Sequence, residues 1–441
     1  MSIIKIKLAN TPKLERLQYV LDYLKSHPLA PQEIDFQLVE SSENLAYGGE
    51  SVQGINFMPA NNFFFQKELS ECNQEENEAI LSNSTFVEMS FVDNRFSFDI
   101  FETIFFHITR WEEWICQKKD LDEHGRMISK KMYLVKNDLH STPLVDELVI
   151  AFYEAMGFKI NTRPTRFRMT HDIDILEKFP SFYKFLRAVG NLIFRIKQPQ
   201  KIGKLFFQYF HKGKDPFDTF DWLLAQNDDF EKKVIYFLSG GSTRFEGFFD
   251  IHSAKAKRAI KLTKERGYEI GIHPSYEAAV KETLTEREKE ALEKAANQTI
   301  QKTRQHFLRW QFPQTPRLIE KANLKEDSTL GFHDLIGFRC GTGFPYYMYD
   351  FEKERPFNFK EVPLVVMDVS LLKMVSNTQN RFELNSDAIQ NVGEILDSFL
   401  QKNQSNTMIT FNFHNSTFDE VALDAEKLKE IYLQILLRLR S

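Results

Sequence analysis

The sequence predicts an α/β protein with two domains, the second built on a parallel sheet. After residue 160, apolar segments with the composition of strands alternate with helical segments, which is the pattern of a parallel sheet. The 441 residues exceed the length that one hydrophobic core usually serves. Because Pro164 separates a helical region from an extended one, we expect domains at residues 1–160 and 161–441.

Composition and charge exclude several classes of protein. With 57 Lys and Arg against 62 Asp and Glu, the net charge is −5, so no nucleic-acid partner is expected. The sequence has no run of roughly 18 apolar residues, the length that a membrane helix needs, and its first residues lack the apolar stretch of a signal peptide. We therefore expect a cytoplasmic protein without a transmembrane segment. The three cysteines have no CxxC spacing, so any bound metal must use histidine and carboxylate ligands.

The first domain is predicted to combine short extended segments with helices, in an α+β arrangement. A helical run extends from Phe98 to Gln117, a charged turn covers residues 120–126, and a second helix ends near Gly157. We recognise no catalytic spacing in this domain, so its role is not predicted.

The second domain is predicted to contain strands and helices in alternation. A helix is expected over residues 253–266, where Gly267 stops it, and a capping box at Thr285 and Glu288 predicts a second helix that runs toward Arg304. Catalytic groups gather at the carboxyl ends of parallel strands, so the residues that end each apolar run are the candidates for a site. The predicted strands are residues 166–174, 232–240, 267–276, 305–312, 360–370 and 406–415.

Two carboxylates end the first of these strands. Because strand side chains alternate, Asp172 and Asp174 project to one face while Ile173 packs on the other. Like charges this close are unfavourable unless a cation or a proton separates them. A metal on one carboxylate and proton transfer by the other would meet this requirement. When the two aspartates are considered without the other strand ends, they could instead belong to a solvated turn or a helix N-cap.

Histidines end two further strands. His273 precedes Pro274 and is a candidate metal ligand, and Glu277 is a candidate third ligand or an exposed carboxylate in the first turn of a helix. His414 ends the last strand and is a candidate general acid, or else a hydrogen-bonded core histidine. Agreement between strand ends far apart in the sequence favours a shared site.

Arginines and polar residues near these strand ends are candidates for supporting roles. Arg309 is predicted to hold a carboxylate base ionised through a bidentate contact. The glycine-containing loop at residues 337–345 includes Arg339 and Thr342, and we expect both to contact substrate. Asp368, at the end of the fifth strand, is expected to line the same site.

The order of these motifs resembles the polysaccharide deacetylase family, also called the NodB-homology or carbohydrate esterase family 4 proteins, over residues 165–441. The segments THDID, GIHPSY, DSTLGF and GFRCGTGFP are similar to an uncharacterised bacterial branch with a separate N-terminal domain. The resemblance implies a distorted (β/α) barrel. It also implies a hydrolase that removes an N-acetyl group from an amino sugar or glycan precursor, with a divalent metal ion that we expect to be zinc.

Carried over to this sequence, the resemblance implies that Asp172 is the base and His414 the acid, that Arg309 orients the base, and that Asp174 and His273 are metal ligands. The sequence departs from the family in two respects: Ile173 separates the two aspartates, and Glu277 replaces the second histidine of the HxxxH motif. The third ligand is therefore open between a water, Glu277 and a histidine from elsewhere, such as His306.

Two other functions remain open at this point. The pair Asp172 and Asp174 could be the DxD motif of a nucleotide-sugar glycosyltransferase, although His273 and His414 would then have no role. A catalytically inactive carbohydrate-binding or scaffolding protein on the same fold is the second alternative, because the HxxxH motif is incomplete.

A basic helical insert is predicted near residues 180–225. Residues 184–214 contain eight Lys and Arg, no Asp or Glu, and several interleaved Phe residues. The insert is either a solvated helical face or a lid or membrane-surface patch that contacts an anionic membrane or glycan precursor. The basic residues are Lys184, Arg187, Arg195, Lys197, Lys201, Lys204, Lys212 and Lys214.

Overall fold

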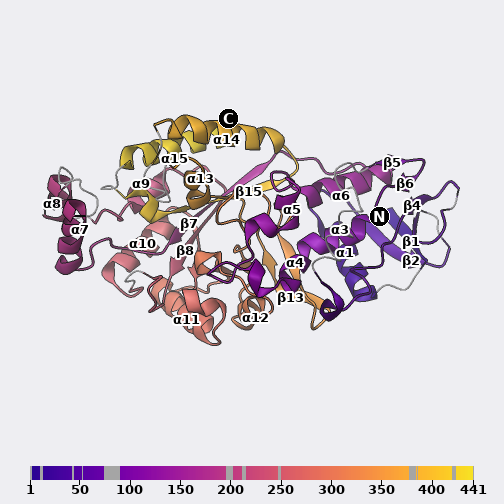
Figure 1. Cartoon of the computed structure of the whole chain (residues 1–441), viewed down its shortest axis with the longest axis horizontal. Helices are drawn as coiled ribbons and strands as arrows, with labels where there is room; N and C mark the ends of the chain where they lie inside the picture. Colours follow the sequence, from indigo (N-terminus) through magenta and orange to yellow (C-terminus); the bar gives the residue numbers. More distant parts are fainter. Residues whose placement is uncertain are drawn as a thin grey trace.

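The computed structural model shows an elongated molecule, with the N-terminal sheet at one end, at the right, and the C-terminal sheet near the middle (Figure 1). Within the described residues, no helix is both long enough and apolar enough to cross a membrane. The structure describes residues 2–9, 13–41, 44–51, 53–73, 90–194, 202–210, 215–246, 250–376, 384, 386–419 and 424–440.

The N-terminal part contains a six-stranded sheet in the order β2-β1-β3-β4-β6-β5, parallel except for β5 against β6. The predicted helix over residues 98–117 is two helices, because Arg110 has a left-handed backbone with φ 56° and turns its buried guanidinium toward Glu112 and Glu113. The strands are β1 (Ser2–Leu8), β2 (Ile34–Val39), β3 (Leu45–Tyr47), β4 (Asn56–Met58), β5 (Phe91–Val92) and β6 (Arg95–Phe96); the helices are α1 (Leu14–Ser26), α3 (Ile100–Ile108), α4 (Trp111–Ile115), α5 (Tyr133–Lys136) and α6 (Leu144–Ala155).

The C-terminal part contains a nine-stranded sheet in the order β12-β13-β11-β10-β9-β8-β7-β15-β14. All neighbouring strands are parallel except β12 and β13, which confirms the parallel α/β architecture. The strands are β7 (Arg166–Ile173), β8 (Lys232–Leu238), β9 (Glu269–His273), β10 (Lys302–Thr303), β11 (Glu326–Asp327), β12 (Tyr346–Asp350), β13 (Arg355–Glu361), β14 (Val366–Met367) and β15 (Met408–His414).

The expected barrel is not closed in the described part of the chain, where the sheet has β12 and β14 as its edges. The β12 edge is covered by the N-terminal half: the ring of Tyr19 on α1 lies 4.8 Å from that of Tyr349, and the Tyr19 hydroxyl donates a hydrogen bond to the Tyr347 carbonyl. Helices that cover an edge strand protect its unpaired backbone groups, so no further strand needs to pair with it.

Four of the six predicted strands are confirmed, as β7, β8, β9 and β15. Residues 305–312 are not a strand, because they form a turn in which Phe307 has φ 61°. Residues 360–370 divide between the end of β13, the two residues of β14 and the start of α13. The strand of this region that reaches the site is instead β10, and it is only two residues long.

Helices of the C-terminal part lie around this sheet (Figure 1). The helix predicted over residues 253–266 is α10, and Ser253 caps it by accepting from the Ala256 amide. Glu288 accepts hydrogen bonds from Ser275 instead of closing a capping box with Thr285. The predicted second helix is α11 and ends at Ala296, before Arg304. The helices are α7 (Phe182–Phe194), α8 (Ile202–Phe210), α9 (Phe220–Ala225), α10 (Ala254–Glu265), α11 (Leu284–Ala296), α12 (Gln314–Lys321), α13 (Asp368–Met374), α14 (Ala388–Lys402) and α15 (Ala425–Arg440).

One apolar core extends through both halves of the chain. It includes Ile4 of β1, Trp111 of α4 and Ile272 of β9 among its buried members. The indole of Trp111 is fully buried, and its ring lies 5.0 Å from that of Phe351 in the C-terminal half. The two predicted domains therefore share a packed interface, and the division near residue 160 stays a prediction.

We expect Trp111→Ala to destabilise the whole chain by about 3–5 kcal/mol, the usual cost of truncating a large buried aromatic side chain. Urea unfolding followed by circular dichroism gives the free energy of unfolding. Leu38→Ala is the matched control, because Leu38 is 41% exposed on β2 and its truncation leaves no cavity. Equal stability of the two variants would contradict the shared core.

Candidate metal centre and active site

A cavity of about 270 Å³ opens at the carboxyl ends of the central strands. Asp172 and Asp174 reach it from β7, His273 from β9 and His414 from β15. The sheet thus brings these four predicted site residues together, since neighbouring parallel strands end at the same edge. The remaining lining residues are His124, Arg126, His306, Phe307, Leu308, His333, Met367 and Val369.

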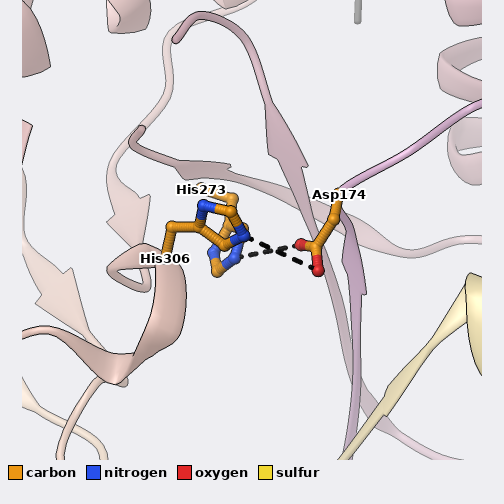
Figure 2. A group of neighbouring side chains, drawn as sticks. All are labelled: Asp174, His273 and His306. Carbon is orange, nitrogen blue, oxygen red and sulfur yellow. Dashed lines mark ion pairs between the residues drawn. The ribbon is translucent and has the colours of Figure 1, made fainter. Parts of the chain in front are cut away.

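Asp174, His273 and His306 form a compact group of possible metal ligands (Figure 2). One ligand atom from each lies within 4.8 Å of the others. Asp174 Oδ1 is 3.2 Å from His273 Nε2, and Asp174 Oδ2 is 3.8 Å from His306 Nε2. Two imidazoles and a carboxylate are a common ligand set for zinc.

The tautomer of His273 shows why a cation fits this position. His273 Nδ1 lies 2.6 Å from the Arg304 carbonyl oxygen, which can only accept, so Nδ1 carries the hydrogen. In the neutral form of the ring, the lone pair of Nε2 points at Asp174 Oδ1, and both atoms are buried without a hydrogen-bond partner. Two acceptors that face each other this closely need a positive charge between them, and a metal ion would supply it.

The sequence analysis left the third metal ligand open between several candidates, and His306 is the candidate that lies beside Asp174 and His273. Burial lowers the pKa of His306, but the charges of Asp174 and Glu246 outweigh burial and raise it to about 9. Glu246 lies 3.9 Å from His306 Nδ1 and is fixed by the Tyr276 amide. The pKa of Asp174 is well below its usual value despite burial, because His306 and His414 lie close to it.

The expectation for Glu277 is wrong in this structure. Its carboxylate pairs with Lys281 at 2.6 Å, and the side chain is 39% exposed, outside the group of ligands. Glu277 lies in the short turn η5 (Tyr276–Ala279), which turns it away after β9. The alternative prediction, an exposed carboxylate in the first turn of a helix, describes Glu277 correctly.

Asp172 is held by two donors and not by the predicted arginine. Its Oδ1 accepts from Arg304 Nη1 at 3.0 Å, and its Oδ2 accepts from Asn412 Nδ2 at 2.9 Å. Arg309 instead donates to the carbonyls of His124 and Tyr276. Arg304 follows the two-residue strand β10 directly, so it is the strand-end residue that the misplaced strand at 305–312 concealed.

His414 points its Nε2 atom at both aspartates, 3.7 Å from Asp174 Oδ2 and 3.9 Å from Asp172 Oδ2. Asp368 accepts from the His414 amide at 2.8 Å and lies 2.8 Å from Nδ1. Burial lowers the pKa of His414, but Asp368 and Asp174 outweigh burial and raise it to about 9. The ring is therefore protonated at neutral pH. Asp368 orients this histidine, which corrects its expected role in substrate binding.

Arg339 and Thr342 do not line the cavity, contrary to expectation. Arg339 donates to Glu113 and to the Gly331 carbonyl, and the Thr342 hydroxyl donates to Asp146. All these partners are buried at the interface between the two halves of the chain. The glycine-containing loop therefore connects the halves of the molecule.

The N-terminal half contributes two residues to the cavity that the sequence analysis missed. His124 and Arg126 lie in the charged turn after α4, which Asp122 closes by accepting from both backbone amides. Arg126 Nη1 donates to the Phe307 carbonyl at 2.6 Å, and His124 Nδ1 is 3.1 Å from the Tyr276 hydroxyl. No spacing in the sequence indicates this contact, because it depends on how the two halves pack.

Comparisons with known proteins give one family match and several structural matches. A model of a family of unknown function, DUF7033, matches residues 6–161. A search of curated protein sequences finds no match. Among solved structures, the chain is similar to a protein described as a polysaccharide deacetylase from Mycobacterium smegmatis, at 13% identity and a TM-score of 0.37, over 62% of this chain and 85% of that one.

Two further solved structures show a comparable level of similarity. One is Puue allantoinase, at 10% identity and a TM-score of 0.36, over 62% of this chain and 84% of that one. The other is a polysaccharide deacetylase from Bacillus cereus, at 8% identity and a TM-score of 0.30, over 63% and 88% of the two chains. These similarities leave the activity to be inferred from the site.

We expect Asp174→Ala and His273→Ala each to abolish retention of a divalent metal, because each removes one of three protein ligands. Metal content after gel filtration, measured by mass spectrometry, checks this. Glu277→Gln is the control and should retain metal at the level of the unaltered chain. Stoichiometric metal in both alanine variants would contradict the assignment of Asp174 and His273 as metal ligands.

We expect metal binding to release about one proton from His306 near neutral pH. Its pKa is raised to about 9, so the ring is protonated there, whereas a ligating imidazole must be neutral. Apparent metal affinity should accordingly increase as the pH rises toward 9. Calorimetry in two buffers of different ionisation enthalpy counts the protons. His306→Gln should release about one fewer, and an unchanged count would contradict the role of His306.

Proposed function

We propose that the chain is a metal-dependent hydrolase that removes the acetyl group from an amino sugar or glycan precursor, with zinc as the metal. The observation that carries the proposal is the pair of facing acceptors, His273 Nε2 and Asp174 Oδ1, 3.2 Å apart beside a carboxylate and a protonated imidazole. A cation position, a base and an acid around one cavity are the groups that amide hydrolysis requires.

Asp172 would act as the base. Arg304 and Asn412 both donate to its carboxylate, and these two hydrogen bonds fix its orientation. From this position it can accept a proton from a water molecule in the cavity. A divalent ion held by Asp174, His273 and His306 would polarise the amide carbonyl.

His414 would act as the acid. Its Nε2 faces the cavity and carries a proton at neutral pH, because the pKa is raised to about 9. When the water oxygen bonds to the carbonyl carbon and the carbon–nitrogen bond breaks, Nε2 donates this proton to the leaving nitrogen. Asp368 holds Nδ1 and the backbone amide, so the ring cannot turn the proton away.

The size of the cavity supports a small reacting group. At about 270 Å³ it lies below the roughly 300–1,000 Å³ typical of pockets that enclose a drug-sized ligand. An acetamido group fits such a space while the remainder of a larger substrate stays outside. The choice of an amino sugar rests on the resemblance of the sequence motifs.

The alternatives explain less of the geometry. In a DxD glycosyltransferase both aspartates would hold the metal, whereas Asp172 is engaged by Arg304 and Asn412. An inactive scaffold was favoured by the incomplete HxxxH motif, but His306 supplies the missing imidazole. The cytoplasmic location remains a prediction from the sequence.

We expect Asp172→Asn to bind metal and to lose about 10²–10⁴-fold in kcat, because an amide cannot accept a proton from water at neutral pH. His414→Ala should cost about as much, since it removes the proton donor. Both act in one sequence of proton transfers, so the double variant should be far less than multiplicatively impaired.

The assay is acetate release from N-acetylated amino-sugar oligomers, with the metal content of each variant measured in parallel. Glu277→Gln is again the control and should remain fully active, because its carboxylate lies outside the ligand group and pairs with Lys281. Unchanged activity of metal-loaded Asp172→Asn would refute the proposed mechanism.

A further inference from the structure

A helical hairpin made of α7 and α8 is inserted directly after the strand that carries Asp172 and Asp174. Figure 1 shows it at one end of the long axis of the molecule, at the left, opposite the N-terminal sheet. Asp215 closes the base of the insertion by accepting from the amides of Lys178 at 2.8 Å and Phe179 at 3.0 Å. The hairpin is therefore anchored at its base and extends away from the sheet.

Exposed apolar side chains are concentrated on this hairpin. The described residues include fifteen large apolar side chains that are exposed, and eight of them lie in α7 and α8. Isolated exposed apolar residues are ordinary, but a cluster of this kind marks an interaction surface. Phe194 is 79% exposed and Tyr183 is 73% exposed. The other six are Phe182, Leu186, Ile193, Phe206, Phe207 and Phe210.

The hairpin already has an apolar interior of its own. Phe185 and Leu205 are buried against each other's helices together with Phe179, and the ring of Tyr209 stacks on Phe185 at 4.2 Å. At 3.6 residues per turn, Tyr183 and Phe194 fall on the side of α7 opposite to Phe185. Phe182, Phe206 and Phe210 border the interior, because their rings lie 5.0–5.9 Å from that of Phe185. The exposed residues thus extend the apolar surface from the border of this interior to the far side of α7.

The sequence that contains the hairpin is strongly basic. Residues 184–214 contain eight Lys and Arg and no Asp or Glu, in a chain whose net charge is −5. Lys184 and Arg187 are exposed on α7, beside Tyr183 and Leu186. The segments 195–201 and 211–214, which hold most of the other basic residues, lie outside the described residues.

We propose that this hairpin docks on an anionic lipid bilayer. Aromatic side chains next to Lys and Arg on an amphipathic helix are the composition of an interfacial membrane contact, in which apolar groups enter the headgroup region and cations meet anionic lipid. A second copy of the chain fits less well, because pairing two hairpins would bring their positive charges together. The proposal does not depend on the hydrolase activity.

Co-sedimentation of the full chain with vesicles tests the proposal. Vesicles of phosphatidylglycerol and phosphatidylcholine should bind it, whereas pure phosphatidylcholine vesicles should bind it far less. High salt should weaken the binding, because it screens the attraction between the charges. Equal binding to both kinds of vesicle, or none to either, overturns the proposal.

Charge reversal identifies the surface involved. We expect Lys184→Glu with Arg187→Glu to weaken binding to anionic vesicles at least about 25-fold, since each basic residue near such a surface contributes roughly five-fold. The matched control is Arg287→Glu with Lys294→Glu, one arginine and one lysine exposed on α11, and it should bind like the unaltered chain. Equal losses in both double variants overturn the proposal, because they would indicate a general effect of net charge.

Substitution of the apolar face gives an independent test. Tyr183→Ser with Phe194→Ser should also abolish binding, while Leu433→Ser with Leu437→Ser on α15 should not. Circular dichroism confirms that each variant is folded. Sedimentation velocity distinguishes the alternative partner: a dimer that Phe194→Ser dissociates, without any vesicle binding by the unaltered chain, overturns the membrane assignment.

Discussion

The site depends on one electrostatic constraint: two carboxylates at the end of one strand, both lining the same cavity, each require a separate positive partner. Arg304 supplies it for Asp172, in a network that also holds Thr170 and Asn412. The imidazoles of His306 and His414 supply it for Asp174. The guanidinium of Arg304 stays bound to Asp172, whereas a metal ion can replace a proton between an imidazole and Asp174. The two aspartates therefore cannot exchange their roles.

The N-terminal half takes part in the site as well as in the fold. It shares the apolar core through Trp111, covers the β12 edge through Tyr19, and sends His124 and Arg126 into the cavity wall. Two hydrogen bonds hold the turn that carries these residues: Asp122 accepts from the His124 amide, and the Phe307 carbonyl accepts from Arg126. A shift between the two halves would therefore change the shape of the cavity that the substrate enters.

The residues at the strand ends were predictable from sequence. The residues that contact their side chains were only partly predictable. Asp172, Asp174, His273 and His414 each follow an apolar run long enough to be recognised, and the sheet brings them together. Arg304 and His306 follow β10, whose two residues give no periodicity, so the prediction moved the strand to 305–312 and chose Arg309. Arg339 and Thr342 failed for a different reason: their glycine-containing loop faces partners in the N-terminal half, and only the tertiary packing brings those partners near.

The spacing of the two aspartates has a mechanical consequence. Ile173 is fully buried between them, and the strand is paired with both β8 and β15 up to Asp172, while Asp174 follows directly after β7. Two residues of a strand advance by about 6.6 Å, and their side chains share a face. The proposed base therefore lies within the paired strand, and the proposed ligand lies at the point where the chain leaves it. His414 enters from the adjacent strand, where its residue is paired in register with Asp172. Base and acid are thus set by the register of two neighbouring strands, and the proposed ligand follows at the carboxyl end of one of them.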